Sequence, residues 1–190
     1  MIKKLSLLGA MLALVLNLSA ATRAQMLEAI SLAGTRNTEV KTDFNETRAM
    51  PRKEKVTLKG TLLYRSPDFL DMVYEDAEKE HFCIDGKKMT NRREGREVKS
   101  DLSKNLLMRG LANTLLYAFS GQVEKIADEQ NTTLAVSEEA DGYHVVLDAR
   151  KKQPHGYSHI EIIYRKSDGR IALMQMDEFN GASTLYSLAK

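Results

Sequence analysis

The sequence has one cysteine, no tryptophan and only three prolines among its 190 residues. A single cysteine cannot form a disulfide within the chain. This residue, Cys83, stands between Phe82 and Ile84, so we expect a buried thiol on a strand rather than a catalytic one. The prolines are scattered, and no proline- or glycine-rich linker separates two halves. The sequence therefore predicts one domain, over residues 25–190.

Long apolar runs are also scarce, and the one at the N-terminus has the pattern of an export signal. Lys3 and Lys4 precede an apolar run over residues 5–18, which is shorter than a membrane-spanning helix needs. Small residues follow, so cleavage after Ala21 or after Ala24 is expected. No cysteine lies at either point to carry a lipid anchor. Residues 1–24 are therefore interpreted as a signal peptide that directs the chain to the periplasm.

Charge of one sign is not in excess. Removing residues 1–24 would take away three basic residues and no acid, which changes the net charge from +2 to −1. Nucleic-acid binding usually needs a clustered basic face. The basic cluster over residues 87–96 is interrupted by Glu94, and we interpret it as a solvated hairpin. No nucleic-acid partner is predicted.

Period-two alternation of apolar and polar residues runs through most of the chain and predicts half-buried β-strands. Four dipeptides between these strands, Asp85-Gly86, Asp141-Gly142, Asp168-Gly169 and Asn180-Gly181, are typical of hairpin turns. The expected strands cover residues 40–45, 56–65, 70–75, 82–84, 87–91, 133–137, 143–149, 158–166, 170–179 and 183–188.

The period changes over residues 102–119, where leucines recur at helical spacing. Ser100 or Asp101 is the expected N-cap, and Gly121 is expected to end this helix. A shorter helix is predicted near residues 27–32. Sequential antiparallel strands with one broadly apolar helix predict a mainly β (α+β) fold: a curved antiparallel sheet or unclosed β-barrel with an α-helical lid over a hydrophobic cavity.

The inner wall of this cavity is expected to be flexible, because the chain has only five phenylalanines but nine methionines. Methionine side chains adapt to variable acyl chains, although they also fill ordinary cores. Both interpretations stay open from the residues alone. The candidate cavity residues are Leu58, Leu62, Met72, Tyr74, Leu107, Leu111, Leu115, Val145, Leu147, Ile162, Met174 and Met176.

Several segments in their order along the chain resemble the periplasmic lipoprotein carriers of the LolA family. These are residues 43–45, 60–74 and 84–87 in the first half, and 168–171, 176–177, 180–181 and 184–186 in the second. The resemblance implies an unclosed barrel with a helical lid that takes the acyl chains of lipoproteins. It also implies two partners, an inner-membrane lipoprotein-releasing complex and an outer-membrane acceptor, and a monomeric carrier.

One position departs from the family's pattern. The carriers have an arginine immediately before a proline, and this arginine holds the lid by hydrogen bonds. Here Ser66 occupies that position before Pro67, and Arg65 precedes it. Arg65 is therefore the candidate lid latch that the resemblance implies.

Other functional classes find little support in the sequence. His155 and His159 have a spacing that suits two metal ligands on a helix, but the segment carries Pro154 and Gly156 and leads into a strand, where only a loop could bring the two together. No serine elbow, phosphate-binding loop or CxxC motif occurs. No enzyme activity, metal or cofactor is therefore predicted. A module of the same fold that senses a lipid or another ligand and reports it to a membrane regulator is the alternative to a carrier.

Overall fold

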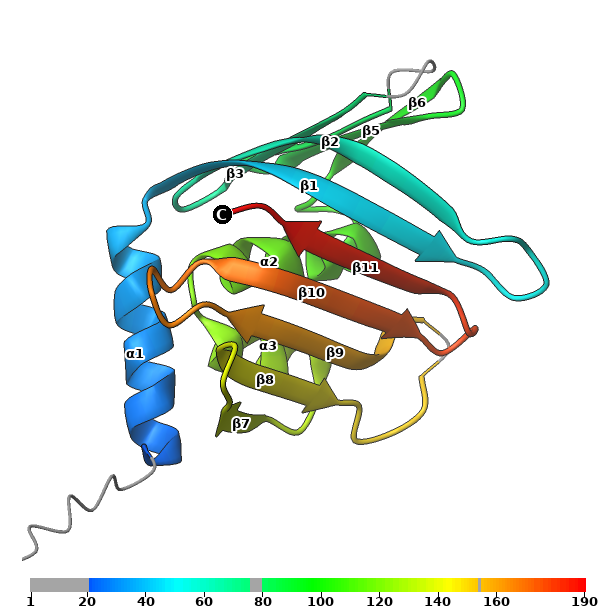
Figure 1. Ribbon diagram of the computed structural model, residues 1–190. Coiled ribbons are helices and arrows are strands. Elements are labelled where there is room, and N and C mark those ends of the chain that lie inside the picture. The colour runs from blue at the N-terminus through cyan, green and yellow to red at the C-terminus, as the bar shows by residue number, and fades with distance from the viewer. Residues whose placement is uncertain (1–20, 76–79, 154) are drawn as a thin grey trace, which may run out of the picture.

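The structure is a computed structural model that describes residues 21–75, 80–153 and 155–190 (Figure 1). These residues form an 11-stranded sheet in which every neighbouring pair of strands is antiparallel. The elements in chain order are α1 (Arg23–Arg36), β1 (Glu39–Ala49), β2 (Val56–Arg65), β3 (Phe69–Tyr74), β4 (His81–Asp85), β5 (Lys88–Arg93), β6 (Arg96–Asp101), α2 (Leu106–Phe119), α3 (Val123–Gln130), β7 (Ala135–Glu138), β8 (Tyr143–Asp148), β9 (Tyr157–Tyr164), β10 (Ile171–Glu178) and β11 (Ser183–Leu188).

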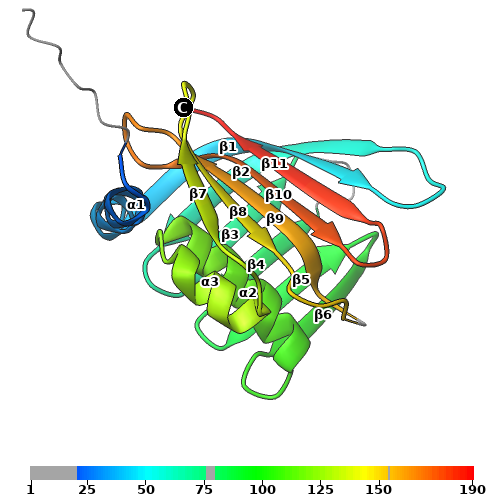
Figure 2. The same cartoon turned by 90° about the horizontal axis from the view of Figure 1, so that it is seen from below.

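The sheet consists of two runs of sequential hairpins, β1 to β6 and β7 to β11, joined where β1 pairs with β11. β6 and β7 therefore form the two outer edges of the sheet. The chain passes from one edge to the other through α2 and α3, which lie beneath the concave face (Figures 1 and 2). The mainly β fold with an unclosed, curved sheet and a helix on its concave side is confirmed.

Alternation and turn chemistry explain most strands. In β2, Gly60, Leu62 and Tyr64 are buried while the residues between them are more exposed, as a period of two requires. The glycines of the predicted turns at 85–86, 168–169 and 180–181 adopt positive φ angles between +56° and +85°, which glycine tolerates without steric cost. These turns join β4 to β5, β9 to β10 and β10 to β11.

The predicted start of the long helix was wrong by several residues. The helix begins at Leu106, and its N-cap is Asn105, whose side-chain oxygen accepts a hydrogen bond from the amide of Met108 at 3.1 Å. Asp101, one of the two expected caps, instead accepts hydrogen bonds from the amide and hydroxyl of Ser103. The amide of Leu102 also bonds to the carbonyl of Lys87, so this segment stays attached to the sheet.

Helix α1 is longer than predicted and packs at one end of the sheet (Figure 1). Its N-cap is Thr22, which forms a capping box with Gln25. A Cβ atom on Gly34 would lie 2.0 Å from the carbonyl oxygen of Ser120, and one on Gly121 would lie 2.4 Å from that of Ile30. Only glycines allow the backbones of α1 and the α2–α3 connection to approach this closely.

The predicted signal peptide lies mostly outside the described residues, which begin at residue 21. Within the described ranges, no helix has the length and apolar character needed to cross a membrane.

The core fills the concave side of the sheet. Leu62, Met72, Val145, Ile162 and Met174 are each at most 2% exposed, and all belong to one cluster that also includes the buried side chains of α2. The interior beneath most strands is therefore packed with side chains, and two cavities that meet beside α2 provide open space.

Candidate binding site

Helix α2 differs in burial between its two ends. Ala112, Leu115 and Ala118 in its C-terminal part are at most 3% exposed. Leu106 and Leu107 in its first turn are 69% and 50% exposed. A single large apolar side chain is often exposed on a protein surface. Here two adjacent leucines are exposed at the same end of one helix. This end of α2 is therefore the part of the helix with apolar surface available to a ligand.

The exposed leucines border a groove of about 480 Å³. α2 forms one wall, the C-terminal end of α3 forms another, and the segment before β9 forms the third. This volume lies within the range of roughly 300–1,000 Å³ that small-molecule sites occupy. The lining residues are Leu106, Leu107, Met108, Gly110, Leu111, Glu129, Gln130, Gln153, His155, Gly156, Tyr157 and Glu178.

A second, smaller cavity of about 200 Å³ lies deeper under the sheet. It shares Leu111, Tyr157 and Glu178 with the groove, so the two spaces meet at these side chains. Leu115, Tyr74 and Met176 contribute to its wall, together with charged side chains from β1 and from the segment before β4. The cavity is therefore amphipathic rather than purely hydrophobic.

The charged side chains in this cavity form a network around Arg48. Its Nε and Nη2 donate hydrogen bonds to the two carboxylate oxygens of Glu46 at 2.6 and 3.0 Å, and its Nη1 donates to Glu80 at 2.7 Å. The hydroxyl of Tyr74 donates to Glu46. Glu46 is 2% exposed, so this carboxylate is almost fully removed from water.

Burial and neighbouring charges shift the pKa of three side chains at this cavity. Burial raises the pKa of Tyr74, and the charge of Glu46 raises it further, so the phenol stays neutral. Burial alone would lower the pKa of Arg48, but the hydrogen bonds that it donates to Glu46 and Glu80 raise it. Tyr186, which also lines the cavity, has a pKa raised chiefly by burial. The deep end of the site thus presents the guanidinium of Arg48, held between the carboxylates of Glu46 and Glu80, with Arg93 also in the wall.

The predicted cavity residues occupy three kinds of place. Four of the twelve predicted residues line the deep cavity and two line the groove, and Leu111 lines both. Leu58 is partly buried against the core. The deep cavity contains Tyr74, Leu111, Leu115 and Met176; the groove contains Leu107 and Leu111; the packed core contains Leu62, Met72, Val145, Leu147, Ile162 and Met174.

Arg65, the candidate latch, lies at the end of β2. Its Nε donates to Glu39 of β1 at 2.8 Å, with both side chains more than half exposed, and its guanidinium lies over the ring of Phe69 of β3. The interactions described for Arg65 thus connect neighbouring strands. Its role as a lid latch stays a prediction.

The polar network was missed at the sequence level, although a signal for it exists. The alternation that buries Val40 and Phe44 on β1 continues in phase to Glu46 and Arg48. Charged residues at positions that should face the core indicate a buried polar cluster. Their partner Glu80 lies 32 residues beyond Arg48 and could not be assigned from spacing.

The three histidines of the second half have different surroundings. His155 lines the groove. The Nε2 of His144 is 2.8 Å from Asp141, and the Nδ1 of His159 is 2.8 Å from Asp148. Each of the last two is engaged by a different carboxylate on strands or turns.

Comparison with known proteins identifies no family. A scan against protein families and a search of curated proteins both give no match. Among solved structures, the chain is similar to a LolA superfamily protein from Nitrosomonas europaea, with 10% identity, a TM-score of 0.42 and coverage of 90% of this chain and 93% of that one.

Two further structures are similar at the same level. An outer membrane lipoprotein-sorting protein domain from Vibrio parahaemolyticus shares 10% identity, with a TM-score of 0.43 and coverage of 88% of this chain and 91% of that one. The lipoprotein LppX from Mycobacterium tuberculosis shares 9% identity, with a TM-score of 0.38 and coverage of 89% and 96%. At these values the matches do not assign the chain to a family.

Proposed function

We propose that this chain is a non-enzymatic periplasmic carrier that shelters the acyl chains of lipoproteins between the inner and outer membranes. The acyl chains occupy the groove beside the first turns of α2. The observation that carries this proposal is the pair of neighbouring leucines, Leu106 and Leu107, exposed by 69% and 50% at the border of a 480 Å³ groove.

The energetics of apolar surface favour an apolar occupant. Burying a leucine side chain fully is worth about 1.5–3 kcal/mol relative to leaving it in water. Leu106 and Leu107 forgo part of this stabilisation because they are exposed. An acyl chain in the groove would recover it, and Met108 and Leu111 extend the same surface. A flexible methionine adapts to chains of different shape.

The deep cavity gives the ligand a polar end. Leu111, Tyr157 and Glu178 connect the groove to the network of Glu46, Arg48 and Tyr74. A lipoprotein's acylated terminus carries ester and amide groups next to its acyl chains, so it matches an apolar groove that meets a polar cavity. Both oxygens of Glu46 accept hydrogen bonds from Arg48, so this part of the cavity is a fixed polar wall.

The first experiment measures binding of a fluorescently labelled triacylated lipopeptide by anisotropy. We expect Leu106→Ser/Leu107→Ser to weaken binding about 10- to 100-fold, since each 1.4 kcal/mol is a factor of ten. The matched control is Leu32→Ser/Val73→Ser, which removes two side chains of similar exposure from α1 and from the outer face of β3. Equal affinity in the two double variants, or no binding by the wild type, would overturn the groove as the acyl site.

The second experiment separates a carrier from a sensor. Donor vesicles containing the labelled lipopeptide are mixed with unlabelled acceptor vesicles, and transfer is followed with and without the protein purified from the periplasm. We expect the protein to accelerate transfer and the Leu106→Ser/Leu107→Ser variant to do so less. Tight binding without accelerated transfer would overturn the carrier and leave the ligand-sensing module. The inner-membrane releasing complex and outer-membrane acceptor belong to the same proposal.

A further inference from the structure

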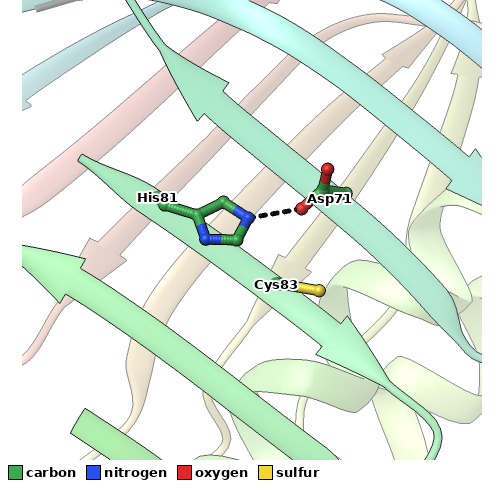
Figure 3. Close-up of side chains that lie close together, drawn as sticks. All are labelled: Asp71, His81 and Cys83. Carbon is green, nitrogen blue, oxygen red and sulfur yellow. Dashed lines mark hydrogen bonds and ion pairs between the residues drawn. The ribbon is translucent and has the colours of Figure 1, made fainter. Parts of the chain in front are cut away.

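Three side chains with metal-binding atoms gather on the outer face of the sheet, away from the groove (Figure 3). Asp71 of β3 lies directly opposite Cys83 of β4, and His81 lies two residues before Cys83. On β3 the residues on either side of Asp71, Leu70 and Met72, are buried in the core. Strand alternation therefore places Asp71 on the convex side, where the two β4 side chains join it.

The ligand atoms are already close. Nε2 of His81 is 2.6 Å from Oδ1 of Asp71, and one imidazole nitrogen, the thiol sulfur and one carboxylate oxygen lie within 4.8 Å of one another. Figure 3 shows the imidazole of His81 directed at the carboxylate, with Cys83 beside it on the same strand. The side chains of His81 and Asp71 are 30% and 27% exposed, so an ion can reach them from solvent.

We propose that Asp71, His81 and Cys83 bind Zn²⁺, or a divalent transition-metal ion of similar softness, with three protein ligands and one open coordination position. Zinc takes thiolate, imidazole and carboxylate ligands at about 2.0–2.3 Å in tetrahedral geometry. A thiolate and an imidazole together favour such an ion over Mg²⁺ or Ca²⁺, which prefer oxygen. Ligands on two paired strands are held by the ladder, so only side-chain rotations are needed.

The three candidate ligands also contact one another. The carboxylate of Asp71 contacts Nε2 of His81 and hydrogen-bonds the Cys83 thiol. Binding of the ion to sulfur breaks the S–H bond and releases that proton to solvent. Binding to the imidazole requires Nε2 to give up the proton it donates to Asp71, which a neutral ring regains from solvent at Nδ1. No oxidation or reduction is involved.

A second group, Glu139, Asp141 and His144, also has its oxygen and nitrogen atoms within 4.8 Å of one another. It lacks a thiol, its two acids are exposed, and Nδ1 of His144 is turned to Glu161 at 3.3 Å. This group provides a matched control, because removing its histidine changes the same residue type at an alternative site.

Cys83 is the only cysteine, so its labelling reports on this site alone. The purified protein is stripped with a chelator and reacted with a maleimide in the presence or absence of ZnCl₂. We expect Zn²⁺ to slow labelling by at least about tenfold in the wild type and in His144→Gln, and we expect this protection to be lost in His81→Gln and Asp71→Asn. The site is overturned if Zn²⁺ does not slow labelling of the wild type. It is also overturned if Zn²⁺ slows labelling of His81→Gln and Asp71→Asn as much as that of the wild type.

A spectroscopic readout on the wild type covers the case in which a ligand variant misfolds. Co²⁺ replaces Zn²⁺ in such sites and produces a thiolate-to-metal absorption band in the near ultraviolet. We expect this band in the wild type and its loss in Cys83→Ser, while circular dichroism confirms that the variant is folded. A Co²⁺ spectrum without thiolate absorption in the wild type contradicts the proposal.

Discussion

The hydroxyl of Tyr164 donates a hydrogen bond to the carbonyl oxygen of Ala118 over 2.8 Å, which ties β9 to the C-terminal end of α2. The ring of Tyr64 stacks on that of Phe119 at the same end, with centroids 5.3 Å apart. The opposite end of α2 carries the exposed Leu106 and Leu107. A lid movement of α2 would therefore begin at its N-terminal end and pivot near Phe119.

Replacement of Tyr164 by phenylalanine should test this anchor. Tyr164 is 2% exposed, and the substitution removes its hydroxyl while keeping the ring. We expect the free energy of unfolding to fall by about 0.5–1.5 kcal/mol, the usual net worth of one hydrogen bond. Urea denaturation measures the change. Tyr143→Phe, at a partly exposed position, is the control, and an equal loss in both variants would argue against a specific anchor.

A second contact holds α2 to α3. Glu129 accepts hydrogen bonds from the side-chain amide of Asn113 at 3.0 and 2.8 Å and from the hydroxyl of Tyr117 at 3.1 Å. We expect Glu129→Ala to lower the local opening free energy of α2 by about 1 kcal/mol, since these bonds are exposed. Hydrogen exchange of amides 106–119 measures this effect. Asp128→Ala removes an exposed acid one residue earlier and should leave α2 exchange unchanged.

Most strands could be predicted from the sequence because strand alternation and glycine turns are local signals. The start of α2 could not, because Asp101 and Asn105 are both good caps and their tertiary partners decide between them. Helix α3 was missed because Val123 and Ile126 are its only buried residues, and an eight-residue segment gives little periodic signal.

The candidate sites depended more on tertiary contacts. Apolar residues of β2, β3 and β9 were expected to line a cavity, but Leu62, Met72 and Ile162 pack in the core. Alternation identifies which face is inward and cannot tell whether that face is filled. The cluster of Asp71, His81 and Cys83 was equally out of reach, since strand pairing rather than spacing along the chain brings Asp71 to the other two.

The buried network around Arg48 should be more sensitive than a surface ion pair of the same chemistry. Glu46→Gln removes a carboxylate whose side chain is 3% exposed, while Arg48 keeps its contact with Glu80. We expect a loss of about 3 kcal/mol in unfolding free energy, the lower end for breaking a buried pair.

The matched control is Glu39→Gln, which breaks the pair between Glu39 and Arg65, where both side chains are more than half exposed. Exposed pairs contribute about 0–1 kcal/mol. Chemical denaturation of both variants measures the difference. Similar losses of unfolding free energy in the two variants would show that the network is hydrated in solution. The network could then not serve as a fixed polar wall of the proposed ligand site.

Thiol reactivity of Cys83 in the presence of a chelator provides the last prediction. Burial, followed by the charge and hydrogen bond of Asp71, raises the pKa of Cys83 from an ordinary value of 9.0 to about 11. Only the thiolate reacts with a maleimide. The higher pKa therefore predicts native labelling at about pH 8 that is roughly 10- to 100-fold slower than labelling in denaturant.

Asp71→Asn separates the two causes of this shift. The substitution removes the negative charge opposite Cys83, so the pKa should fall and labelling should become faster while the partial burial of Cys83 is retained. Asp85→Asn is the matched control, because Asp85 is a smaller contributor to the same shift and should accelerate labelling less. The rate is measured from about pH 7 to pH 10, where it should rise tenfold per unit. Native labelling as fast as in denaturant would show an exposed thiol, and unchanged labelling in Asp71→Asn would separate Asp71 from Cys83 and weaken the metal site that needs both.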